Sequence, residues 1–78
     1  MRKLLDNLDK LHTTNLGVKR IKKNLNFESD DVISYCQKLI LDPESKIIKH
    51  GKNYYITTKT EIITINATNY TIITAHQL

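Results

Sequence analysis

Two different hydrophobic periods divide the chain. Apolar residues first recur every three or four positions, which is typical of amphipathic helices, and later alternate with polar residues, which is typical of strands. The pattern predicts helices over residues 2–11, 16–25 and 30–41 and strands over residues 46–50, 53–59, 61–66 and 70–76. We therefore expect an α+β fold in which two or three N-terminal helices pack on one face of a three- or four-stranded antiparallel sheet.

Polar and turn-forming residues separate these elements. The sequence Thr-Thr-Asn at residues 13–15 divides the first two helices and supplies capping side chains. Ser29 or Asp30 is expected to cap the third helix, and Pro43 to end it. Gly51-Lys52 predicts a turn between the first two strands. Because the connections between strands are short, an antiparallel meander is the simplest topology.

The length of the chain allows one small domain. A chain of 78 residues buries only about 60% of its unfolded surface. We expect a single domain over residues 1–78, helical over 1–42 and forming a sheet over 46–77. The only cysteine, Cys36, cannot form an internal disulfide, which favours a reducing compartment. Without a secretory leader or a long apolar run, a cytoplasmic location and no membrane partner are expected.

Alternation along the strands assigns residues to the two faces of the sheet. Cys36 and Tyr54 are predicted to belong to the core. The face toward the helices is expected to carry Ile56, Ile63, Ile65, Ile73 and Ala75. The opposite face is expected to carry Tyr55, Thr57, Thr64, Asn66, Thr74 and His76, together with Ile62 and Ile72. Such a face suits either a polar ligand or plain solvated sheet, and the pattern alone does not separate the two.

Positive charge points to a polyanionic partner. The net charge is +4, and residues 19–23 hold four cations in five positions. This favours binding to nucleic acid, either RNA or DNA. The simpler reading is a solvated helix face and a charge that serves solubility.

Several familiar kinds of site are absent from the sequence. One cysteine and the histidines His12, His50 and His76 do not form a zinc-binding pattern. With only Gly17 and Gly51, the chain has no glycine-rich loop for phosphate. We therefore expect neither a metal ion nor an organic cofactor.

One stretch carries a resemblance that covers nearly the whole chain when later segments are added. Residues 12–25, H-T-T-N-L-G-V-K-R-I-K-K-N-L, resemble the signature H-T-T-x-L-G-x-x-R-I-x-x-N-L. That signature is associated with an uncharacterised family of small bacterial proteins, a domain of unknown function. Residues 51–55 and 71–76 also resemble this family. The resemblance implies membership of a family but no activity.

A weaker resemblance concerns the order of elements. Helices followed by a four-stranded meander, with a histidine late in the last strand, are similar to the barnase, EndoU, colicin D and RelE-like ribonuclease superfamily. Those proteins act on RNA, many of them as toxins. The resemblance implies a toxin-antitoxin role and a metal-independent endoribonuclease that cleaves through the RNA 2′-OH.

Such cleavage needs an acid, a base and a donor for the charge that develops on phosphate. Histidine is the side chain whose ordinary pKa lies nearest neutrality. The candidate catalytic residues are His76 and His12 for proton transfer and Arg20 for the phosphate. The candidate substrate-binding residues are Thr74 and Asn66 for hydrogen bonds, Tyr55 for stacking on a base, and Lys19 and Lys23 for the backbone.

Each candidate also has a structural reading. His12 could stand at the end of the first helix, and Asn66 could be a turn residue. The alternative function is a non-enzymatic interaction protein, such as an antitoxin, phage inhibitor or regulator, that binds nucleic acid or a protein partner through its open sheet face or an edge strand. An enzyme should need its histidines, whereas an electrostatic binder should need its lysines. The oligomeric state stays open.

Overall fold

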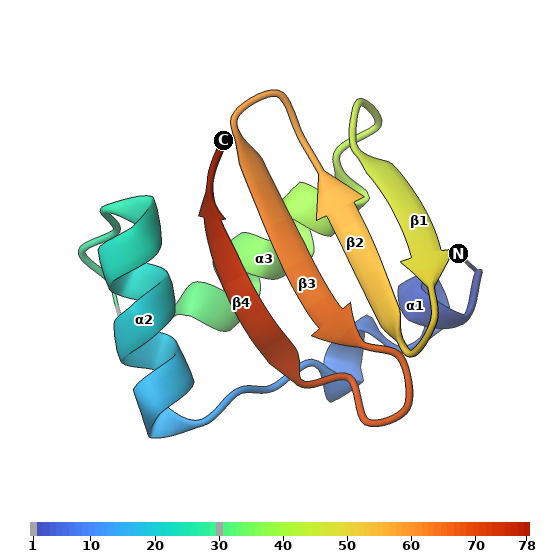
Figure 1. The fold of residues 1–78 in the computed structure, drawn as a ribbon, viewed down its shortest axis with the longest axis horizontal. Helices are drawn as coiled ribbons and strands as arrows, with labels where there is room; N and C mark the ends of the chain where they lie inside the picture. Colours follow the sequence, from blue (N-terminus) through green and yellow to red (C-terminus); the bar gives the residue numbers. More distant parts are fainter. Residues whose placement is uncertain (1, 30) are drawn as a thin grey trace.

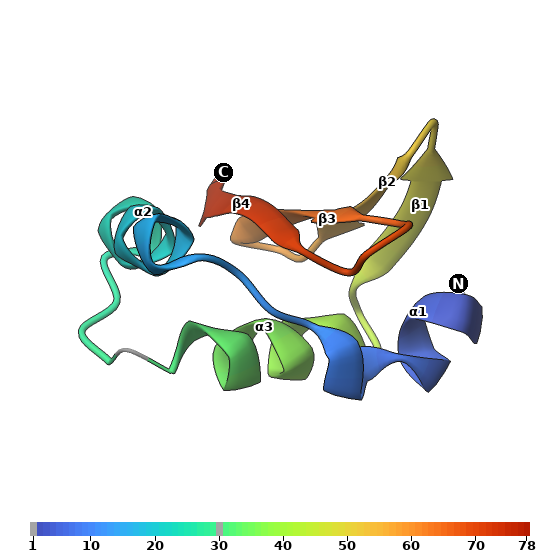
Figure 2. The same ribbon diagram turned by 90° about the horizontal axis from the view of Figure 1, so that it is seen from below.

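A computed structural model describes residues 2–29 and 31–78, and it has two layers (Figures 1 and 2). The helices are α1 (Arg2–Asp6), the 3-10 helix η1 (Leu8–Lys10), α2 (Asn15–Leu25) and α3 (Val32–Leu41). The strands are β1 (Lys46–His50), β2 (Asn53–Thr57), β3 (Glu61–Asn66) and β4 (Ile72–Gln77). Figure 2 shows α1 and α3 beneath the sheet and α2 beside β4. The predicted α+β class, with helices packed against an antiparallel sheet, is confirmed.

The four strands form one meander in the order β1-β2-β3-β4, and every neighbouring pair is antiparallel. The two edges of this sheet differ. On one side α2 packs against β4, whereas β1 pairs with β2 alone and has its other side open (Figure 1). One face of the sheet is covered by the helical layer, and the other stays uncovered.

Local capping explains where α2 begins and ends. The hydroxyl oxygen of Thr14 accepts a hydrogen bond from the backbone N–H of Gly17 at 2.9 Å, as an N-cap does. Asn26 ends the helix in the left-handed conformation, with φ of 54°. Lys22 and Lys23 lie in the last turn, where positive charge stabilises the helix terminus.

The first helix is interrupted where the apolar spacing predicted a continuous one. The side-chain amide of Asn7 donates to the Lys3 carbonyl at 2.7 Å, and its backbone N–H donates to Leu4 at 3.1 Å. These local bonds compete with the helical pattern, so α1 ends at Asp6 and a separate 3-10 turn follows.

The cap of α3 also differs from the prediction. Asp31, rather than Ser29 or Asp30, is the N-cap, since its carboxylate accepts a hydrogen bond from the backbone of Ser34 at 3.2 Å. The Ser29 hydroxyl accepts from Asp31 N–H at 3.1 Å and so positions the capping residue. Asp30 lies outside the described residues.

The core draws on both halves of the chain. Val32, Cys36 and Ile40 form the buried stripe of α3, and burial, with the charge of Glu61 as a second cause, raises the pKa of the Cys36 thiol to about 12. Cys36 is therefore a protonated core residue, as predicted. The buried apolar set is Leu4, Leu11, Ile21, Leu25, Val32, Cys36, Ile40, Tyr54, Ile56, Ile63, Ile65, Ile72 and Ala75.

A β-bulge changes the predicted faces of β4. Thr64 pairs with Thr74, but the next residue of β3, Ile65, pairs with Ile72, so Ile73 has no partner. Ile72 is consequently buried, with 1% exposure, whereas Ile73 is 46% exposed. The predicted placement of Ile72 outside and Ile73 inside is wrong, because strict alternation does not allow for an extra residue. Residues beyond the bulge keep their predicted faces.

One carboxylate lies in the core. Glu61 is 7% exposed and accepts hydrogen bonds from the hydroxyls of Tyr35, Thr58 and Thr60. Hydrogen bonds are what make a buried charge tolerable, and these three join α3 to the β2–β3 turn. The bond to Glu61, the burial of the phenol and the charge of the carboxylate raise the pKa of Tyr35 to about 12.

This bond predicts a pH-dependent stability. The folded pKa of Tyr35 exceeds the ordinary value of 10.0, so the unfolded chain loses the phenol proton first. The contribution of the bond is therefore complete below pH 10 and is lost between about pH 10 and pH 12. Tyr35→Phe should lower the free energy of unfolding in urea by about 1–3 kcal/mol at pH 7, and this difference should shrink over that alkaline range.

The matched control is Glu61→Gln, which removes the charge but keeps the side-chain shape. In that background the folded pKa of Tyr35 should fall toward the ordinary value of 10.0, so the loss of stability between about pH 10 and pH 12 should become smaller. A difference between Tyr35→Phe and the parent that stays constant from pH 9 to pH 12 would contradict the role given to this bond.

Candidate functional site

The uncovered face of the sheet gathers polar side chains into rows. We call it the open face. Strand register places Lys46, Thr57, Ile62 and His76 in one row and Ile48, Tyr55, Thr64 and Thr74 in the next. A third row begins with His50, Asn53 and Asn66. The sheet therefore brings together four predicted site residues, Tyr55, Asn66, Thr74 and His76.

Helix α2 runs alongside the last strand of this face. The Thr13 hydroxyl donates to Ile72 O at 3.0 Å, and the Gln77 amide donates to Leu25 O at 3.3 Å. The first bond joins the beginning of α2 to the beginning of β4, and the second joins the end of β4 to the end of α2. The helix and the strand therefore run parallel to each other. At about 1.5 Å per helical residue and 3.3 Å per strand residue, Arg20 lies level with the stretch from Thr74 to His76.

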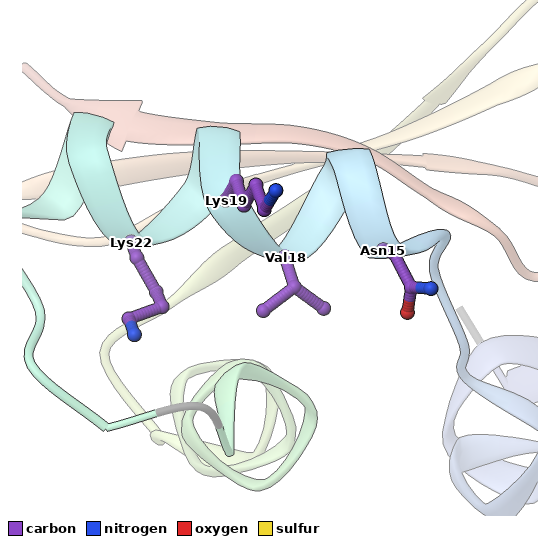
Figure 3. Close-up of a pocket in the computed structure, with 4 residues that line it drawn as sticks. All are labelled: Asn15, Val18, Lys19 and Lys22. Carbon is purple, nitrogen blue, oxygen red and sulfur yellow. The ribbon is translucent and has the colours of Figure 1, made fainter.

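The buried side of α2 determines which of its two flanks faces the helical layer and which lies nearer the open face. A helix turns about 100° per residue. Val18 and Lys22 therefore lie on one flank of the stripe, and Arg20 lies on the other. In Figure 3 Val18 and Lys22 point toward α3 beneath the sheet. Arg20 is thus on the flank nearer the open face, and its side chain is exposed.

A groove of about 520 Å³ opens on the opposite flank of α2. Its lining is formed by Asn15, Val18, Lys19 and Lys22 (Figure 3). Lys19, a predicted substrate-binding residue, thus lines this groove, whereas Lys23 is exposed on α2. The cations of the 19–23 cluster accordingly do not all serve one surface.

His12 is held at the far end of β4 from His76. Its Nδ1 donates to the Lys10 carbonyl at 2.9 Å, since a carbonyl can only accept, and its Nε2 bonds the Thr71 hydroxyl at 2.9 Å. His76 follows Thr71 by five positions in the sequence, which corresponds to about 16 Å along a strand. The structure therefore does not bring the two histidines to one phosphate, whose entering and leaving oxygens share a phosphorus atom.

The side chains of His76 and Arg20 are not used to stabilise the described part of the fold. Within the described part of the chain neither forms a hydrogen bond or an ion pair, and both are exposed. Asn66 differs, because its Oδ1 accepts from the backbone of Thr68 at 2.8 Å and of Asn69 at 3.1 Å, as a turn residue does. His76 and Arg20 are thus available to a ligand, whereas Asn66 is used in a turn.

The segment before α2 is fastened to the start of β4. The backbone of His12 accepts from Ile72 N–H at 2.8 Å and donates to Tyr70 at 3.3 Å. Gly17 packs so closely behind this segment that an added Cβ would stand 2.1 Å from the Thr13 hydroxyl oxygen. Only glycine leaves that hydroxyl room to bond β4.

The comparison with known families matches residues 5–76. The chain belongs to the family described as Protein of unknown function (DUF3781). No curated protein and no solved structure matches it. The predicted membership of an uncharacterised family is confirmed, and nothing in these comparisons supports the resemblance to the ribonuclease superfamily.

The described part of the DUF3781 domain lacks two further features. Among residues 2–29 and 31–78, no three histidine, cysteine, aspartate or glutamate side chains are grouped to hold a metal ion. None of the helices described for this chain is long and apolar enough to cross a membrane.

Sequence reasoning missed three residues that matter for the surface and its support. Glu61 lies on the same face of β3 as Ile63 and Ile65. A charged residue among core positions was therefore the sequence signal that could have identified it. Lys46 and Ile48 join the open face only through their pairing with β2, which depends on register.

The tight packing at Gly17 makes a testable prediction. Alanine favours helix by about 1 kcal/mol over glycine, yet Gly17→Ala should destabilise the DUF3781 domain by about 1–3 kcal/mol, because Thr13 must give up its bond to β4. In a Thr13→Ala background the same change should be neutral or stabilising. Urea unfolding of the four proteins of this double-mutant cycle measures the coupling, and additive effects would contradict the contact.

Proposed function

We propose that this protein binds RNA through the open face and the adjoining surface of α2. The observation that carries the proposal is the register, which collects hydroxyl, amide and imidazole groups on a face that no helix covers. Hydroxyls and amides suit the 2′-OH groups and base edges of RNA. The exposed cations of α2 suit its phosphates.

The charge distribution supports this function more than the net charge does. Arg20 has no ion-pair partner among the residues described, and α2 places it level with the stretch of β4 from Thr74 to His76. A guanidinium binds phosphate through two parallel hydrogen bonds, and an unpaired one is available for that role. At the other edge of the open face, Lys46 stands in the same row as His76.

A matched pair of variants tests the surface. Arg20→Gln with Lys23→Gln removes two exposed charges of α2 that lie outside the groove, whereas Lys10→Gln with Lys38→Gln removes two exposed charges from the helical layer. Fluorescence anisotropy with a labelled RNA should show weaker binding for the first pair, with the salt slope reduced by about 1.4 for a single strand. The second pair should bind as the parent does.

Equal losses in the two pairs would mean that net charge, rather than this surface, attracts the RNA. A parent protein that binds no RNA at low salt would overturn the proposal and leave the protein-partner alternative.

A second candidate function is metal-independent cleavage of the bound RNA. It is favoured by one observation, namely that the exposed His76 and Arg20 lie at the same level of β4 and α2. His76 would take the proton from the 2′-OH, water would protonate the departing 5′-oxygen, and Arg20 would hold the phosphate as charge develops. His12 is committed to the Lys10 carbonyl and to Thr71, so His76 would work without it.

The catalytic candidate predicts RNA cleavage that persists in EDTA and leaves a cyclic phosphate. His76→Ala should slow it about 100-fold or more at saturating RNA, while His50→Ala, at the other edge of the open face, should leave the rate at saturating RNA unchanged. Gel analysis of a labelled RNA pool measures both rates. Cleavage that is unchanged in His76→Ala would exclude His76 as the group that transfers the proton. A parent protein that cleaves no RNA would leave RNA binding as the function.

A further inference from the structure

An apolar stripe crosses the polar open face. Ile48 on β1 stands directly opposite Tyr55 on β2, and such pairs have Cβ atoms about 4.5–5.5 Å apart. Ile62 on β3 is the diagonal neighbour of Tyr55 and lies within about 8 Å. Ile48 is 61% exposed, and the other two are partly exposed. Three neighbouring side chains therefore form an apolar platform around one aromatic ring.

Polar groups surround this platform and restrain its ring. The Asn53 amide donates to the Tyr55 hydroxyl at 3.3 Å, which limits the motion of the phenol. Thr64 and Thr74 continue the row of Tyr55 toward α2, and Thr57 stands beside Ile62. A planar ring with hydroxyls on the adjoining strands is suited to a nucleobase attached to a ribose.

Positive charge lies at both margins of the platform. Lys46 stands at the β1 end of its row, and Arg20 is the cation at the other margin, on α2 beyond β4. His76 ends the row of Lys46 on β4, three strand spacings away, or about 14 Å, and contributes an imidazole there. A phosphate backbone that crosses the strands from α2 to β1 would thus meet cations on either side of Tyr55.

We infer that the nucleic acid bound here is single-stranded and places an unpaired base on Tyr55. This rests on the proposed RNA binding and specifies its substrate class. In a duplex both faces of every internal base are covered by neighbouring bases, so none can stack on a protein ring. A single strand exposes those faces, and stacking on an aromatic residue is its usual mode of binding to a sheet.

The absence of tryptophan from the chain allows a direct test. Tyr55→Trp places the one indole of the protein on the platform. Titration with an unlabelled 12-nucleotide single-stranded RNA should quench its fluorescence saturably, because the indole stacks on a base. The same RNA annealed to its complement should bind more weakly and should not quench. Leu41→Trp, at the exposed end of α3 in the helical layer, is the control fluorophore.

Affinity measurements give an independent readout. Tyr55→Phe keeps the aromatic face and should bind single-stranded RNA as the parent does. Tyr55→Ala should lose about 5- to 140-fold in affinity, which corresponds to one stacked base. Circular dichroism checks that each variant is folded, and the Tyr55→Trp titration does not require the alanine variant.

The outcomes separate this inference from the proposed function. Single-stranded RNA that binds without quenching, or a duplex that binds as tightly, overturns the inference and leaves RNA binding in place. Binding of neither form at low salt overturns both. Saturable quenching by the single strand alone, with the predicted loss in Tyr55→Ala, supports the inference.

Discussion

The arrangement of this protein depends on the attachment of residues 12–14 to the beginning of β4. A parallel bridge between His12 and Thr71, the bond from Thr13 to Ile72 and the imidazole bond to Thr71 join positions 59 residues apart in sequence. Closing so long a loop has an entropic cost, which several bonds at one point offset together. They connect the helical half to the last strand and set where α2 begins.

That attachment decides which edge of the sheet is covered. With α2 parallel to β4, the β4 edge is protected and β1 is left as the free edge. Lys46 and Lys49 lie on β1, and charged side chains of this kind discourage pairing with another strand. The same placement puts Arg20, which has no ion-pair partner among the described residues, on the flank of α2 nearer the polar sheet face. One structural constraint thus creates the surface to which we assign RNA binding.

Residues of the same chemical type have different roles in this fold. Both ring nitrogens of His12 form hydrogen bonds, one to the Lys10 carbonyl and one to the Thr71 hydroxyl. The side chain of His76 is exposed and forms no hydrogen bond or ion pair among the described residues. The buried carboxylate of Glu61 is likewise committed, since three hydroxyls satisfy it and tie α3 to the β2–β3 turn. Several of the polar groups that form no bond within the described structure, among them the side chains of Arg20 and His76, lie on the open face and α2.

The sequence by itself determined the α+β class, the order of elements, and the core roles of Cys36 and Tyr54, because side-chain periodicity follows directly from helix and strand geometry. It also placed Tyr55, Thr74 and His76 on one face. It did not determine the bulge at Ile73, the burial of Glu61 or the separation of His12 from His76. Those depend on strand register and on contacts between distant segments, which local patterns do not encode and only tertiary packing decides.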